Sequence, residues 1–157
     1  MSTIVSNIVY GGIDGTVTTF AVMAAGIGSN LTGVTVAILA LANLFADGFS
    51  MGVSSYESVV GESEDPILKA VTTFIAFVAI GMIPVIGYYI VRNEDYDTKF
   101  TVTAVGAVLT LFLIGAFKSY ASDTRDPIKS GLKTATLGVI AGAIAYGVSI
   151  YLSRFDS

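Results

Sequence analysis

The chain has 157 residues, of which 54% are hydrophobic and 13% are charged, and its mean hydropathy is +0.78. Soluble domains carry about 25% charged residues, so this composition favours a membrane protein over a soluble one. The net charge of −4 excludes a nucleic-acid partner, because phosphate binding needs a basic face. The chain contains no histidine and no cysteine, which excludes disulfides, thiolate metal sites and the Ser–His and Cys–His catalytic sets. We therefore expect no enzyme and no bound cofactor.

Five apolar stretches are long enough to cross a bilayer core, which takes about 20 helical residues. They cover residues 4–27, 34–55, 67–91, 100–120 and 132–152. No basic residue precedes Lys69, so the first stretch lacks the basic region of a signal peptide and is expected to stay in the membrane. The sequence predicts an all-α polytopic membrane protein with five transmembrane helices in a single domain, residues 1–157.

The connections between these stretches have recognisable turn and capping residues. A tight turn between the first two helices is predicted at Gly26, Gly28, Ser29 and Asn30. The dipeptides Asp65-Pro66 and Asp126-Pro127 each join a side-chain N-cap to a proline suited to the first helical turn, so they begin the third and fifth helices. Their similar surroundings suggest either a duplicated helical hairpin or two loops that use the same cap.

Basic residues predict the orientation of the chain in the membrane, because they are enriched on the cytoplasmic side. The side that holds the N-terminus has Lys69, Lys118, Arg125, Lys129 and Lys133, and the other side has Arg92, Lys99 and Arg154. This excess predicts a cytoplasmic N-terminus, in the cell membrane or in the membrane of a vacuole-like compartment.

Asp14 lies about halfway along the first apolar stretch. An ionised carboxylate at the centre of a membrane helix costs on the order of 3 kcal/mol, so such residues usually face a protein interior or a wet path. At helical spacing Asn7, Asp14 and Thr18 share one face, which forms a polar stripe on an otherwise apolar helix. Asp14 is therefore a candidate site for an ion or a proton.

The second stretch, residues 34–55, carries a longer polar stripe, which we call the ladder. It consists of Asn43, Asp47, Ser50, Met51 and Ser54, which recur at steps of three and four residues. Oxygen ligands alone suit Mg²⁺, Ca²⁺, Na⁺ or protons, whereas a thioether favours Fe²⁺, Mn²⁺ or another transition ion. Methionine is also a common filler of apolar cores. The ladder predicts an ion path along one side of this helix.

Small residues accompany both aspartates. Gly48 and Gly52 form a small-xxx-small pair beside the ladder, and Gly11, Gly12 and Gly15 surround Asp14. Such glycines allow helices to pack closely. They either serve packing alone, or they let the two aspartates approach each other or the aspartates of a second copy of the chain.

The residues around both aspartates resemble the vacuolar iron transporter family of membrane metal carriers. The resemblance rests on Asp14-Gly15, on residues 42–51, which read ANLFADGFSM, and on Tyr56 and Ser58. It is specific over roughly the first 60 residues and architectural over the rest. The resemblance implies a homodimer that exports Fe²⁺, and often Mn²⁺, from the cytosol in exchange for protons. It also implies a path between the protomers, lined by the first two helices, with Asp14 and Met51 as ion ligands.

Two features depart from the family pattern. Many members have a glutamate four residues after the methionine, where this chain has Ser55. Most members also carry a long metal-binding insertion between the second and third helices, where this chain has a short acidic loop. The acidic residues of that loop are Glu57, Glu62, Glu64 and Asp65. They either belong to a solvated turn or attract cations weakly. Asp47 is an additional charge that can replace the missing glutamate.

Two other functions fit the same residues. One is a proton- or sodium-linked carrier, or a channel, for another small solute. The other is an accessory membrane subunit whose aspartates pair with basic residues of a partner protein, because no basic residue is predicted in the middle of a helix of this chain. ATP hydrolysis is excluded by the lack of a phosphate-binding loop. The expected partners are thus a divalent metal ion, protons, membrane lipid and a second copy of the chain.

Overall fold

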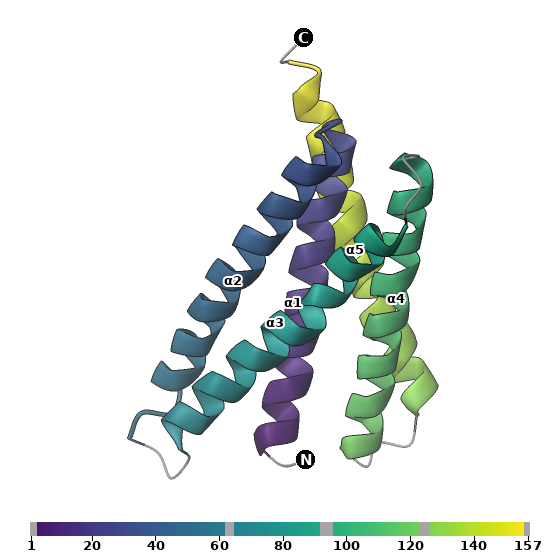
Figure 1. The fold of residues 1–157 in the computed structure, drawn as a ribbon. Helices are drawn as coiled ribbons and strands as arrows, with labels where there is room; N and C mark the ends of the chain where they lie inside the picture. The colour runs from purple at the N-terminus through teal and green to yellow at the C-terminus, as the bar shows by residue number, and fades with distance from the viewer. Residues whose placement is uncertain (1–2, 62–64, 92–95, 123–125, 156–157) are drawn as a thin grey trace.

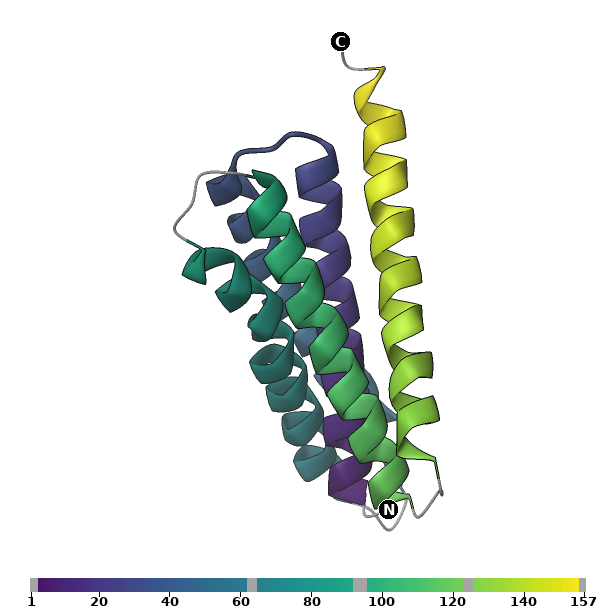
Figure 2. The same ribbon diagram turned by 90° about the vertical axis from the view of Figure 1, so that its right-hand side faces the viewer.

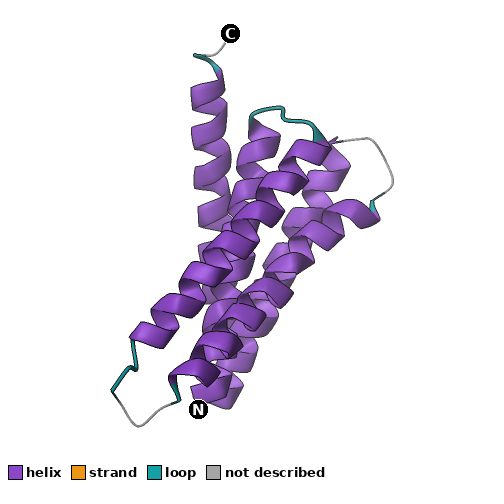
Figure 3. Ribbon diagram, turned by 60° about the vertical axis from the view of Figure 1, so that its left-hand side comes forward, coloured by secondary structure: helices purple, strands orange, loops and turns teal. Residues whose placement is uncertain are grey.

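The computed structural model describes residues 3–61, 65–91, 96–122 and 126–155. Within these residues every regular element is an α-helix (Figures 1 and 3). The helices are α1 (Thr3–Gly28), α2 (Gly33–Glu57), α3 (Pro66–Ile90), α4 (Tyr96–Ala121) and α5 (Pro127–Ser153). All five are long and apolar enough to cross a membrane, which confirms the predicted fold class. Glu62, Glu64, Arg92 and Arg125 lie outside the described residues.

Side-chain caps fix where three of the helices begin. The Asp65 carboxylate accepts hydrogen bonds from the backbone N–H groups of Ile67 at 3.0 Å and Leu68 at 3.1 Å. Asp126 accepts from the N–H of Lys129 at 3.2 Å, so both Asp-Pro dipeptides begin helices as predicted. At the start of α2, the Thr32 hydroxyl accepts from the following turn in the same way.

The predicted turn between the first two helices is shorter than expected. Gly26 and Gly28 are the last residues of α1 that pack against other helices, and an added Cβ at Gly26 would lie 2.9 Å from the Val36 side chain. The turn itself is made at Ser29 and Asn30, where Asn30 adopts a positive φ of 54°. Gly26 and Gly28 thus serve helix packing, and the asparagine alone provides the left-handed conformation.

α1 is the central helix of the bundle. It contacts each of the other four helices, whereas α2 contacts only α1 and α3 within the described residues. The α2–α3 hairpin lies on one side of α1 and the α4–α5 hairpin on the other (Figures 1 and 2). The N-terminus and the α2–α3 and α4–α5 connections lie at one end of the bundle, and the C-terminus lies at the opposite end. A residue in the middle of α1 therefore has protein on most sides.

Two groups of side chains pack α1 against its neighbours. Met23 belongs to a buried cluster whose other members come from α2 and α3, namely Val36, Ala40, Val85 and Tyr88. On the other side, the ring of Phe20 stacks on Phe100 of α4 with centroids 6.4 Å apart, and Phe100 stacks in turn on Tyr146 of α5 at 5.6 Å. Large apolar side chains also cover the outer surface, as expected where helices face lipid.

α1 and α3 approach each other closely because both present glycine at the contact. A Cβ added at Gly11 would lie 2.7 Å from the carbonyl oxygen of Thr73, and one at Gly15 would overlap the backbone of Phe77. From the other helix, a Cβ at Gly81 would lie 2.7 Å from the carbonyl oxygen of Gly15. Neither backbone has room for a methyl group, so these glycines set the distance between the two helices.

Gly81→Ala is expected to destabilise the protein, because the new methyl group would collide with the α1 backbone, which cannot rotate away. Overpacking of this kind costs about 1–3 kcal/mol, which corresponds to a fall in Tm of roughly 3–10 °C for a chain of this size. The measurement is thermal unfolding of the purified protein in detergent. Gly87→Ala, on the same helix, is the control: an added Cβ there meets nothing within 4 Å, so its Tm should equal or exceed that of the wild type. Equal losses in the two variants would contradict the packing role of Gly81.

Candidate ion-binding site

Asp14 lies in the middle of α1, beside the face that packs on α3. Gly11 and Gly15 point at the α3 backbone, so the Asp14 side chain emerges at the edge of this contact and is half-buried. Of the other residues on the predicted stripe, Asn7 is buried, and the Thr18 hydroxyl donates to the backbone carbonyl of Asp14 at 2.9 Å. Thr18 therefore uses its hydroxyl proton within the helix, and Asp14 is the anionic group of this face.

The ladder lies next to the face of α2 that packs on α3. Gly48 and Gly52 are buried against α3, where added Cβ atoms would touch Phe77 at 3.1 Å and Phe74 at 3.3 Å. The small-xxx-small pair thus admits a neighbouring helix, as predicted, and that helix is α3 of the same protomer. Asn43, Asp47 and Met51 are half-buried, and Ser50 and Ser54 are exposed.

Asp14 and Asp47 lie near the middle of α1 and α2, two helices that contact each other. Among the described residues, however, no group of three or more Asp, Glu, His or Cys side chains could hold a metal ion together. One protomer thus contributes two carboxylates, and an amide, two hydroxyls and a thioether on α2 are the remaining candidate ligands. Ions such as Ca²⁺ and Mg²⁺ take six or more ligands, which is more than these carboxylates provide.

A pocket of about 440 Å³ joins Asp14 to the α4–α5 hairpin. Besides Asp14 and Tyr10 from α1, it is lined by Lys118 from α4 and by Lys133 from α5. The sequence pattern did not reveal these lysines as neighbours of Asp14. It assigned them only to the side of the membrane that holds the N-terminus, because both lie near the ends of apolar stretches. The structure begins α5 at Pro127, so Lys133 is its seventh residue. The Asp126-Pro127 cap was the signal that places this lysine inside the helix.

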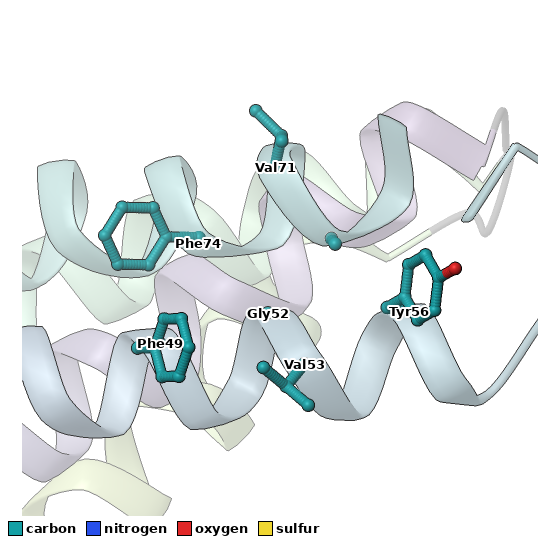
Figure 4. A pocket seen from close by; sticks show the side chains of 7 residues that line it. Phe49, Gly52, Val53, Tyr56, Val71 and Phe74 are labelled. Atoms are coloured by element: carbon teal, nitrogen blue, oxygen red, sulfur yellow. The ribbon is translucent and has the colours of Figure 1, made fainter. Parts of the chain in front are cut away.

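A second pocket, of about 320 Å³, lies between α2 and α3 near the α2–α3 connection. Phe49 and Phe74 lie at one end of it and Tyr56 at the other (Figure 4). Its remaining lining is aliphatic or glycine, and it contains no charged side chain. A cation entering this pocket would lose its water without gaining an anionic ligand, so the candidate ion site is the region of Asp14 and Asp47.

Comparison with known proteins gives a consistent set of relatives. The sequence profile of the VIT family matches residues 5–65 and 57–150. A protein named vacuolar iron transporter from Plasmodium berghei is 23% identical over 221 aligned positions, which cover 92% of this chain and 81% of the relative. The protein of that name from Plasmodium falciparum is 24% identical, with 94% and 81% covered. Vacuolar iron transporter 1 from Eucalyptus grandis is 37% identical over 91 positions, covering 56% of this chain and 35% of the relative.

The length of the alignment and the two matched segments of the profile show where this chain differs from its relatives. The alignment to the Plasmodium berghei protein is longer than this chain, so that protein has additional residues that this chain lacks. The family profile matches in two segments that meet at residues 57–65, the connection between α2 and α3. This agrees with a short loop in place of a longer segment.

Asp14→Asn and Asp47→Asn are each expected to weaken Mn²⁺ binding by about tenfold or more, because each removes a charge that faces a divalent ion in a partly dry environment. If both side chains hold one ion, the double variant should lose less than the product of the two single losses. The measurement is calorimetric titration of the purified protein. Glu57→Gln, an equal charge change at an exposed position on α2, should bind as the wild type does. If the double variant instead loses the full product of the two single losses in Mn²⁺ affinity, the two aspartates belong to separate sites.

Proposed function

This chain belongs to the VIT family and is an integral membrane protein, and on that premise we propose that it exports Fe²⁺, and also Mn²⁺, from the cytoplasm in exchange for protons. The observation that carries the proposal is the pair of carboxylates Asp14 and Asp47, which lie near the middle of two membrane-spanning helices that contact each other. Such groups are costly in lipid and are typical of ion paths and proton relays. The names of the relatives supply the metal.

The proposed ligands come from both helices. Asp14 and Met51 are the ion ligands, and a thioether beside carboxylates favours a transition ion over Mg²⁺ or Ca²⁺. Asp47 takes the role of the glutamate that Ser55 replaces. Asp47 lies one turn before Met51, and Ser55 lies one turn after Met51. Asp47 therefore provides a carboxylate on the same face of the helix. Asn43, Ser50 and Ser54 provide neutral oxygens along the route.

A homodimer would complete the set of ligands. One protomer provides two carboxylates, while Ser50 and Ser54 on the ladder are exposed. Polar side chains are costly against lipid, so a second copy that covers the ladder would remove this cost. A twofold axis beside α1 and α2 would bring both ladders to one shared path and double the number of carboxylates there.

Proton exchange follows from the chemistry of the ligands. A carboxylate binds a divalent cation only when it is deprotonated, so a cation and protons compete for the same oxygens. Protons arriving from the far side would release the metal there, and their loss to the cytoplasm would restore the empty site. The proposed cytoplasmic side is the end of the bundle that holds the N-terminus. The short α2–α3 connection means that capture takes place without the additional segment of the relatives.

Reconstituted protein is expected to move Fe²⁺ and Mn²⁺ into proteoliposomes when the lumen is acidic, and uptake should raise the lumenal pH. The readouts are a trapped metal-sensitive dye and a trapped pH dye, with empty liposomes as the blank. Asp14→Ala should abolish transport while eluting as the wild type does in size-exclusion chromatography. No metal movement by the pure wild type would contradict the proposal and would favour the accessory-subunit function. Metal uptake without any proton movement would contradict exchange alone.

Met51→Leu is expected to lower the preference for Fe²⁺ over Mg²⁺, because leucine keeps the volume of methionine but removes the thioether. We expect transport of Fe²⁺ to fall about fivefold, in line with the loss of one weak ligand worth about 1 kcal/mol. The measurement is Fe²⁺ uptake in competition with Mg²⁺. Met82→Leu, which changes a half-buried methionine on α3 outside the ladder, is the matched control. An equal effect in both variants would show that Met51 serves only packing.

A further inference from the structure

The pocket beside Asp14 combines residues of opposite charge. It is lined by Asp14, Lys118 and Lys133, from three different helices, and both lysines are exposed. Its volume of about 440 Å³ is small enough for a lysine side chain, with its flexible four-carbon stem, to reach across much of it. The two lysines are thus the positive charges that the fold places next to the candidate ion ligand.

The position of the lysines along their helices allows them to extend toward Asp14. Lys118 lies in the last turn of α4 and Lys133 in the second turn of α5, at the end of the bundle that holds the N-terminus (Figure 2). Ile13 and Leu137 line the same pocket. Lysine stems pack on such apolar surfaces while the ammonium group remains in polar surroundings, which here include the Asp14 carboxylate.

The other polar groups of the pocket provide less compensation for a carboxylate. The Thr134 hydroxyl already donates to the backbone carbonyl of Ser130 at 3.0 Å. Ser130 contributes one neutral hydroxyl, and Asp47 lies outside this pocket, on α2, which also contacts α1. The empty site of the proposed function would hold two carboxylates, from Asp14 and Asp47, and the two lysines are the matching number of positive charges.

The geometry points to Lys118 and Lys133 as counter-cations of the ion site, which neutralise the aspartates when no metal is bound and oppose the metal when it arrives. The inference rests on the proposed function and deepens it. A metal ion that binds Asp14 must enter the field of two positive charges, so the lysines lower its affinity. After release, the same charges stabilise the empty carboxylates, so the carrier can return without a bound cation.

The experiment compares Mn²⁺ binding to the purified, full-length protein and its variants by calorimetry at 0.15 M salt, where the Debye length is about 8 Å and distant charges are screened. Lys133→Gln and Lys118→Gln are each expected to bind Mn²⁺ about 3- to 10-fold more tightly than the wild type. Lys129→Gln is the matched control: it makes the same charge change on α5 at a residue that is exposed, as Lys118 and Lys133 are, but does not line the pocket, and its affinity should be unchanged. Lys133→Arg keeps the charge and should also bind as the wild type does.

A double-mutant cycle identifies the partner of the lysines. In the Asp14→Asn background, Lys133→Gln should no longer raise the affinity for Mn²⁺, because the carboxylate that the lysine neutralises is gone. Transport gives a second readout: tighter binding should lower the KM for Mn²⁺ and also lower the maximal rate, because release becomes slower.

Two results would overturn the inference. If the lysine variants bind Mn²⁺ no more tightly than Lys129→Gln does, the lysines only anchor the helix ends at the lipid headgroups. If they bind it more weakly, the lysines position Asp14 rather than compete with the cation. Either result would leave transport by the wild-type protein intact. Conversely, a wild type that binds Mn²⁺ but does not move it across liposomes would refute the proposed function while the effect of the lysines on binding stands.

Discussion

The glycine-mediated contact between α1 and α3 determines where every other part of the bundle lies. Because Gly15 and Gly81 leave no room for side chains, the two backbones meet directly and α1 is held in the centre, in contact with all four other helices. α2 then packs on α3 through its own glycines, Gly48 and Gly52. The contact thus directs Asp14 on α1 and the ladder on α2 away from α3. In lipid, where apolar burial does not drive helix association, such close packing is the main source of specificity.

The arrangement limits the cost of placing carboxylates in a membrane. An isolated aspartate would cost about 3 kcal/mol at the centre of a membrane helix. Here Asp14 is half-buried between α1 and the α4–α5 hairpin, in a pocket that also contains two lysines. Groups of opposite charge thus line one pocket between neighbouring helices. In the proposed role of the lysines, their charges offset the carboxylates of the empty site and are in excess once a divalent cation is bound.

The chain differs from its relatives in the connection between α2 and α3. The profile of the VIT family matches on both sides of residues 57–65, so the membrane helices are shared while the connection is shortened. Within the ladder, Asp47 provides a carboxylate one turn before Met51, and Ser55 stands one turn after it. The ladder of this chain thus carries its carboxylate before the methionine and a hydroxyl after it.

The sequence by itself determined the number of helices and where α3 and α5 begin, because length, hydropathy and the Asp-Pro caps act locally. It also identified Asp14 and the ladder, since a charge in an apolar stretch is conspicuous without any partner. Only the tertiary structure decided that Gly11 and Gly15 pack on α3 and that Lys118 and Lys133 share a pocket with Asp14. Helix faces that meet lipid and helix faces that meet protein are equally apolar, so the hydrophobic pattern carries little information about which helices become neighbours.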